Sequence, residues 1–175
     1  MGLRAPAGGG VVAAVDRGVD LVGRAAAWLV LAIVVLMATN VLLRYAFSIG
    51  SVWSQELEWH LLAPLVLFGM THALNKGEHV RVDIFYARYP ARGQAAVDLL
   101  ASALAVVISA FVIRYSLAYV DQSMSIGEVS SDPGGLTHRW VLKALIPLGF
   151  GLFAVQAAAQ GVAAARRLRH PDPSS

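Results

Sequence analysis

Four long apolar segments constrain what this chain can fold into more than any other feature of its sequence. Each is near the roughly 20 residues that an α-helix needs to cross about 30 Å of hydrocarbon. Helices are the expected spanning form, because they satisfy their backbone hydrogen bonds within one segment. The sequence therefore predicts an all-α membrane protein with four transmembrane helices, at about residues 25–46, 52–74, 95–119 and 140–160.

The composition supports this prediction. Of the 175 residues, 57% are hydrophobic and 14% are charged, whereas soluble domains carry roughly 25% charged residues. The sequence pI near 9.6 could indicate a nucleic-acid-binding protein, but the basic residues stand at the ends of the apolar segments. The sequence has no cysteine, which excludes disulfides, thiol redox chemistry and cysteine-ligated metals.

The first apolar segment is predicted to be retained as a membrane span. About 24 residues precede it, and no A-x-A cleavage site follows its apolar part, so it does not fit a cleaved signal peptide. We therefore expect a cytoplasmic N-terminal tail at 1–23, a transmembrane domain at 24–163 and a cytoplasmic C-terminal tail at 164–175.

The basic residues predict the orientation of the spans. Ten of the 14 Lys and Arg residues lie on one side of the predicted membrane and four on the other, and cytoplasmic segments carry the excess. Both termini and the connector at 75–92 are therefore predicted to be cytoplasmic. The ten are Arg4, Arg17, Arg24, Lys76, Arg81, Arg88, Arg92, Arg166, Arg167 and Arg169, and the four are Arg44, Arg114, Arg139 and Lys143.

The connector between the second and third spans begins NKGEHVRVDIF, at residues 75–85. Asp83 can cap a short helix over IFYARY that ends before Pro90, and such a helix would lie flat at the cytoplasmic interface. An ordinary loop with aromatic anchors explains the same residues, and composition does not decide between the two. His79 and Asp83 are candidates either for contact with a partner protein or for holding the turn.

The middle of the predicted spans holds no ionisable residue. The midpoints fall near Val35, Ala63 and Pro64, Val107 and Phe150. A charge at such a depth costs about 2.5–3.5 kcal/mol on insertion scales and is usually kept for function. An autonomous four-helix exporter coupled to protons, the main alternative function, needs a carboxylate there. The sequence also lacks the paired broken helices of transporter binding sites, so we infer that the chain does not translocate a solute alone.

Polar residues gather near the outer ends of the first two spans, around a turn near Gly50. Arg44 and Glu56 each lie six residues from Gly50, and Asn40 and His60 each lie ten residues from it. Within each span the two polar residues are four apart and share a helical face. We expect an Arg44–Glu56 ion pair and an Asn40–His60 hydrogen bond that lock the hairpin or contact a partner helix. The alternative is that Arg44 snorkels to the interface and Glu56 faces water.

Lys143 lies about one turn inside the fourth span. Its side chain can snorkel outward, or it can pair with Glu58 or Asp121 from the other spans. Either role is structural or concerns a partner protein.

The histidines leave a haem-binding membrane protein as a disfavoured alternative. Four-helix bundles can hold haem between two histidines on facing helices. His60 and His138 lie toward the outer side, and His72 and His79 toward the inner side. His138 and His79 stand at or beyond the span ends, where a haem would be half exposed. We therefore expect no cofactor, no metal site, no catalytic residues and no enzymatic activity.

A series of short motifs between about residues 16 and 166 resembles the small, Q-type membrane subunit of the tripartite ATP-independent periplasmic (TRAP) transporters. The motifs are NVLLRYAF at 40–47, WSQEL at 53–57, GEHVRVD at 77–83, RW at 139–140 and IPLGF at 146–150. Their order and spacing, together with the four predicted spans, make the resemblance specific.

The resemblance implies a scaffold subunit in the bacterial inner membrane. In that family a large multi-span permease carries the substrate and sodium sites and moves as an elevator, while the small subunit supports it. A periplasmic solute-binding protein delivers an organic acid, so the substrate pocket is expected in other chains. The outer loop at about 120–138, with Asp121, Glu128 and Asp132, either faces this binding protein or is only solvated.

Overall fold

The computed structural model describes residues 10–77, 86 and 88–169. Within these residues the chain forms four long helices and no strand. The helices are α1 (Gly10–Phe47), α2 (Val52–Lys76), α4 (Ala91–Ser125) and α5 (Trp140–Arg169). Each is long and apolar enough to cross a membrane, which confirms the prediction of four spanning helices. Residues 84, 85 and 87 of the short interfacial helix expected over 84–89 lie outside the described residues, so this helix stays a prediction.

Three of the helices, α1, α4 and α5, are much longer than the spans predicted for them. α1 has 38 residues and α4 has 35, which correspond to about 57 and 53 Å at 1.5 Å per residue. α1 therefore includes residues 10–23, which we had assigned to the N-terminal tail, and α5 extends to Arg169 within the expected C-terminal tail. Hydropathy marks where a helix leaves the hydrocarbon, but it does not mark where the helix ends.

The beginning and end of α2 have clear local causes. Ser51 is its N-cap and accepts a hydrogen bond from the Ser54 N–H through its side chain, which satisfies one of the unpaired donors of the first turn. Gly77 closes the helix in the left-handed conformation, with φ of 73°, which glycine adopts without steric cost. The helix thus begins at Val52, the residue at which the second span was predicted to start.

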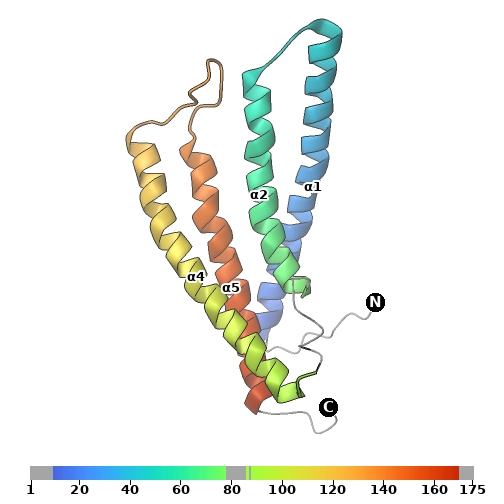
Figure 1. Cartoon of the computed structure of the whole chain (residues 1–175), viewed down its shortest axis with the longest axis vertical. Coiled ribbons are helices and arrows are strands. Elements are labelled where there is room, and N and C mark those ends of the chain that lie inside the picture. Colours follow the sequence, from blue (N-terminus) through green and yellow to red (C-terminus); the bar gives the residue numbers. More distant parts are fainter. Residues whose placement is uncertain (1–9, 78–85, 87, 170–175) are drawn as a thin grey trace.

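The helices form two antiparallel hairpins that do not close into a compact bundle (Figure 1). α1 packs on α2, α4 packs along α5, and α5 joins the hairpins through contacts with α2 and α1. The hairpins meet where α1 begins and α5 ends, called the inner end below, and splay apart toward the turn between α1 and α2, called the outer end (Figure 1).

Small side chains form the seam between α4 and α5. The buried positions of α4 recur every seven residues, the period that keeps one stripe facing a partner helix. The Ser102 hydroxyl donates to the Asp98 carbonyl at 2.8 Å and the Ser109 hydroxyl to the Ala105 carbonyl at 2.7 Å, so both are satisfied within their own helix. The buried residues of α4 are Ala95, Ser102, Ser109, Ser116 and Ser123.

Glycines allow the helices to approach closely at three further points. A Cβ added at Gly149 of α5 would lie 2.7 Å from Cβ of Leu67 on α2. One added at Gly161 would lie 3.2 Å from Cβ of Ser102, and one added at Gly23 of α1 would overlap the His72 ring of α2. Helix association in lipid depends on close packing rather than on hydrophobic burial. We therefore expect the Gly149 contact to hold the two hairpins against each other, and the other two contacts each to hold the helices of one hairpin together.

We expect Gly149→Ala to lower the free energy of unfolding by about 1–3 kcal/mol, because an added methyl group forces Leu67 or the backbone to move. Gly151 is the matched control, since an added Cβ there meets no atom within 4 Å. Gly151→Ala should leave stability unchanged or raise it by about 0.5–1 kcal/mol through its better helix propensity. Thermal unfolding of both purified variants in detergent, followed by circular dichroism, measures the difference. Equal destabilisation would contradict this account.

Candidate functional site

Glu56 is a buried carboxylate at the outer end of the molecule. Only 3% of the residue is exposed, although it lies near the start of α2. Its carboxylate accepts hydrogen bonds from the Ser130 hydroxyl and from the Leu136 N–H, the second at 2.5 Å. Both donors belong to the loop 126–139 between α4 and α5. Glu56 therefore ties this outer loop to the other hairpin.

The outer loop is folded around that carboxylate. The Ser130 N–H donates to the Leu136 carbonyl at 3.1 Å, and the Gly135 N–H donates to the Asp132 carbonyl at 3.0 Å. A Cβ added at Gly135 would lie 2.5 Å from the Ser130 side chain and 2.8 Å from Oε2 of Glu56. Only glycine leaves room for the carboxylate at this position.

Lys143, in the first turn of α5, anchors the start of the same loop. Its ammonium pairs with the Glu128 carboxylate and lies 3.8 Å from the centre of the Tyr119 ring, within the range of a cation–π contact. The hydrogen bond from Lys143 holds the pKa of the Glu128 carboxyl below its ordinary value of 4.5. The loop is thus fixed to α5 by Lys143 and to α2 by Glu56.

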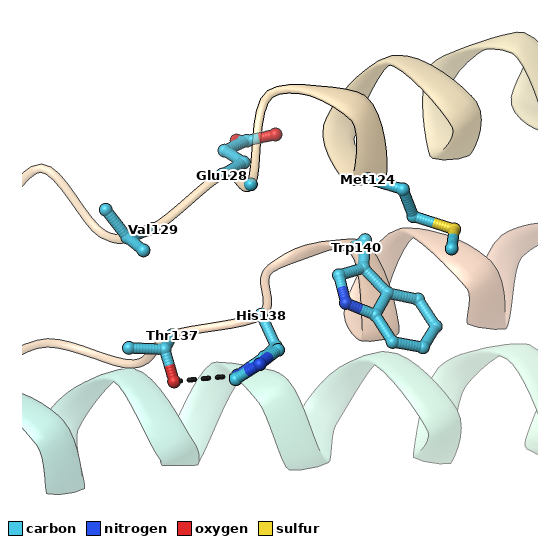
Figure 2. A pocket seen from close by; sticks show the side chains of 7 residues that line it. Met124, Glu128, Val129, Thr137, His138 and Trp140 are labelled. Carbon is cyan, nitrogen blue, oxygen red and sulfur yellow. Dashed lines mark hydrogen bonds between the residues drawn. The ribbon is translucent and has the colours of Figure 1, made fainter.

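A cavity of about 360 Å³ opens between this loop and the first turn of α5 (Figure 2). The Thr137 hydroxyl and Nδ1 of His138 lie 2.9 Å apart on one side of it. His138 has a φ of 61°, an uncommon backbone conformation for a residue other than glycine. The cavity is lined by Met124, Gly127, Glu128, Val129, Thr137, His138 and Trp140. Its wall at Glu128 is held in place by Lys143.

Asn40 joins α1 to α2, but not through His60. Its amide donates to Oε1 of Glu58 at 2.6 Å, and its carbonyl accepts from the Ser54 hydroxyl at 2.5 Å. Nδ1 of His60 instead lies 2.7 Å from the backbone carbonyl of Glu56, one turn earlier in the same helix. Asn40 therefore does form hydrogen bonds across the α1–α2 hairpin, but the predicted partner, His60, is wrong.

The predicted Arg44–Glu56 ion pair is also wrong. Arg44 is exposed and makes no ion pair with any described residue, while Glu56 takes its hydrogen bonds from the outer loop. The cause is the rotation of α2. Ser54 and Glu58 are four apart and both face α1, whereas Glu56 is two residues from each and points roughly 200° away at 3.6 residues per turn. Two residues at equal distances from Gly50 along the chain are expected at a similar height in the hairpin. That distance does not determine whether their side chains point toward each other.

Three further residues, Lys143, His79 and Asp83, were predicted to make structural contacts or to contact a partner protein. Lys143 does make an ion pair, but with Glu128 rather than with either acid that we named. His79 and Asp83 lie outside the described residues, so their roles stay predictions.

The hydrogen-bond donors to Glu56 cannot be recognised from the sequence pattern around it. Ser130 and Leu136 are 74 and 80 residues away along the chain, and no local pattern links such distant positions. Two signals were available in the sequence: a carboxylate near the start of the second span, and a glycine-rich turn between the third and fourth spans. The carboxylate could have been assigned as a hydrogen-bond acceptor and the backbone N–H groups of that turn as donors.

A second polar cluster joins three helices at the inner end. Asp20 of α1 pairs with Lys76 of α2 at 2.6 Å. Gln156 of α5 donates to the Asp16 carboxylate at 3.0 Å, and the Asn75 amide donates to the Asp16 backbone carbonyl at 2.7 Å. This cluster was not predicted, because Asp16 and Asp20 precede the first predicted span and were expected in the N-terminal tail rather than in a helix.

We expect removal of the Glu56 carboxylate to release the outer loop. In Glu56→Ala the Leu136 N–H loses a charged acceptor, so its amide exchange should accelerate at least about tenfold. Asp132→Asn is the control, because it removes one charge from the exposed part of the same loop. Hydrogen exchange of the loop, followed by mass spectrometry, measures both variants. Unchanged exchange in Glu56→Ala would show that the loop holds its shape without this anchor.

The Lys143–Glu128 pair predicts a pH dependence. Because the pKa of Glu128 is lowered in the folded protein, its contribution to stability is fully present above pH 4.5 and is lost as the pH falls through the lowered value. The difference in Tm between the native chain and Glu128→Gln should therefore be constant from about pH 7 to pH 5 and shrink only at more acidic pH. A difference that disappeared already near pH 6 would speak against this pair.

Comparison with known proteins matches most of the spanning region to one family. Residues 33–167 match the model of the tripartite ATP-independent periplasmic transporters, DctQ component. A protein of Haemophilus influenzae described as a TRAP transporter small permease protein is 27% identical over 105 residues, 59% of this chain and 65% of that protein. The ectoine TRAP transporter small permease protein TeaB of Halomonas elongata is 26% identical over 127 residues, 70% of this chain and 65% of that protein.

The chain thus spans 65% of the length of each of these two relatives. The family match covers well over half of the chain and agrees with the resemblance seen in its motifs. With four helices apolar enough to span a membrane, this multi-pass membrane protein belongs to the DctQ component family, the small permease subunits of the TRAP transporters.

Proposed function

We propose that this chain supports the large permease subunit of a TRAP transporter in the bacterial inner membrane, during uptake of an organic acid driven by an ion gradient. In this proposal the large subunit carries the substrate and ion sites, and the present chain has no catalytic role. The observation that carries the proposal is the distribution of polarity. The ion pairs of the described helices lie toward their two ends, while no ionisable residue lies at the span midpoints near Val35, Ala63, Val107 and Phe150.

Large apolar side chains cover the two outermost helices, α1 and α4, over most of their length. Val35 and Val107, near the middle of their spans, are 57% and 51% exposed. Faces of this kind suit lipid tails or the apolar helices of another subunit. On α1 the exposed residues include Trp28, Leu31, Val34, Met37, Val41 and Leu42, and on α4 they include Leu100, Leu104, Ile108, Phe111 and Tyr115.

The outer loop is the part of the chain that we propose to dock the periplasmic binding protein. Its two anchors, at Glu56 and Lys143, support a preorganised surface, and a preorganised loop loses less conformational freedom on binding. Asp132 is exposed on the loop and Asp121 is exposed in the last turns of α4, so both carboxylates are available to basic residues of a partner.

The proposed orientation places both termini and the connector at 75–92 in the cytoplasm, with a short helix over 84–89 at the interface. The excess of Lys and Arg at the inner end supports this topology. The transported compound is proposed to be an organic acid. One relative carries ectoine in its name, and the identity of the substrate is expected to depend on the other two subunits.

The proposal predicts that an affinity-tagged copy of this chain co-purifies with a large permease subunit encoded beside it. Liposomes with both subunits, the binding protein and a sodium gradient should accumulate the organic acid, and omission of this chain should abolish accumulation. Liposomes that hold this chain alone are the control and should show no uptake. Transport by the chain alone, or recovery of the chain without a large partner, would sink the proposal.

A further inference from the structure

Five arginines gather at the inner end of the hairpin formed by α4 and α5. Arg88 and Arg92 flank the start of α4, and Arg166, Arg167 and Arg169 lie in the last turn of α5. The two helix ends are adjacent, because Arg167 pairs with Asp98 of α4 at 3.1 Å. We call these five residues the inner arginine cluster.

Little negative charge compensates this cluster within the described part of the chain. Asp98 pairs with Arg167 and also accepts a hydrogen bond from the Tyr86 hydroxyl at 3.0 Å. The other four arginines are exposed and make no ion pair with a described residue. Concentrated positive charge with a planar guanidinium geometry attracts anions that offer several oxygens, above all phosphates.

An apolar track leads from the cluster toward the middle of the membrane. Val97, Leu100 and Leu104 of α4 are three and four residues apart, so they share one helical face, and they are 43%, 62% and 53% exposed. Tyr89, exposed beside Arg88 and Arg92, suits the boundary between headgroups and hydrocarbon. The surface thus combines a cationic part at the interface with an apolar part directly along the spanning helix.

We propose that the inner arginine cluster binds the phosphate of an anionic phospholipid of the inner leaflet, with the acyl chains along Val97, Leu100 and Leu104. The charge of the arginines is complementary to the headgroup, and the apolar track is complementary to the chains. A soluble anion would use only the first of these features. Each of the three apolar residues is two positions, or roughly 200°, from the buried stripe at Ala95 and Ser102. The acyl chains therefore lie on the face of α4 that points away from α5, and the bound lipid stabilises the inner end of α4.

The test is lipid binding by the purified full chain in a neutral detergent, without any partner subunit. Phosphatidylglycerol and phosphatidylcholine with identical acyl chains are titrated, and bound lipid is measured by native mass spectrometry and by the shift in Tm. We expect phosphatidylglycerol to bind more tightly, to raise Tm and to lose affinity as salt is added. Since the partner is absent, the result does not depend on the proposed function.

Two matched double variants locate the site. Arg92→Gln with Arg166→Gln should weaken phosphatidylglycerol binding by about 25-fold, at roughly fivefold for each arginine near a membrane surface. Arg44→Gln with Arg114→Gln removes the same charge from exposed arginines nearer the outer end and should leave the affinity unchanged. If the first variant does not fold, Arg169→Gln at the end of α5 carries the test, with an expected loss of roughly fivefold.

Three results would overturn the proposal. The first is equal binding of phosphatidylcholine and phosphatidylglycerol. The second is equal loss of affinity in the two double variants. The third is full competition by glycerol phosphate at the same molar concentration, which would assign the cluster to a soluble phosphate compound.

Discussion

The absence of a hydrophobic driving force between helices in lipid is the constraint on which this structure depends. A leucine that leaves hydrocarbon for another helix gains little, so association has to come from close packing and polar contacts. The serine stripe of α4 and the glycines at 23, 149 and 161 provide the close packing. The polar clusters around Glu56 and Asp20 provide the contacts at the two ends.

The outer cluster shows how a carboxylate can be buried without an ion pair to any residue that the structure describes. Burial of a charge is costly unless hydrogen bonds replace its hydration, and the Ser130 hydroxyl and the Leu136 N–H supply them for Glu56. The requirement for those donors fixes the path of the loop, including the glycine at 135. A single side chain of α2 therefore shapes the outer surface of the opposite hairpin.

The open arrangement of the hairpins agrees with membership in a family of transporter subunits. Helices that face other helices on only one side leave broad apolar surfaces, as α1 and α4 do here. In our proposals the large permease subunit covers part of that surface, and phospholipid covers the part next to the inner arginine cluster. Both proposals assign partners to surfaces that the chain does not cover itself.

The sequence by itself predicted four long apolar helices and the family. It also singled out Asn40, Glu56 and Lys143, which make polar contacts in the structure. Hydropathy, segment length, residue spacing and short motifs can all be read from the sequence alone, and they suffice for those conclusions. Only the tertiary structure decided the partners of these residues. Glu56 meets a loop 80 residues away, and Lys143 meets Glu128, because the rotation of each helix about its axis selects which side chains face each other. That rotation is set by the packing of small residues along whole helices, which no short motif encodes.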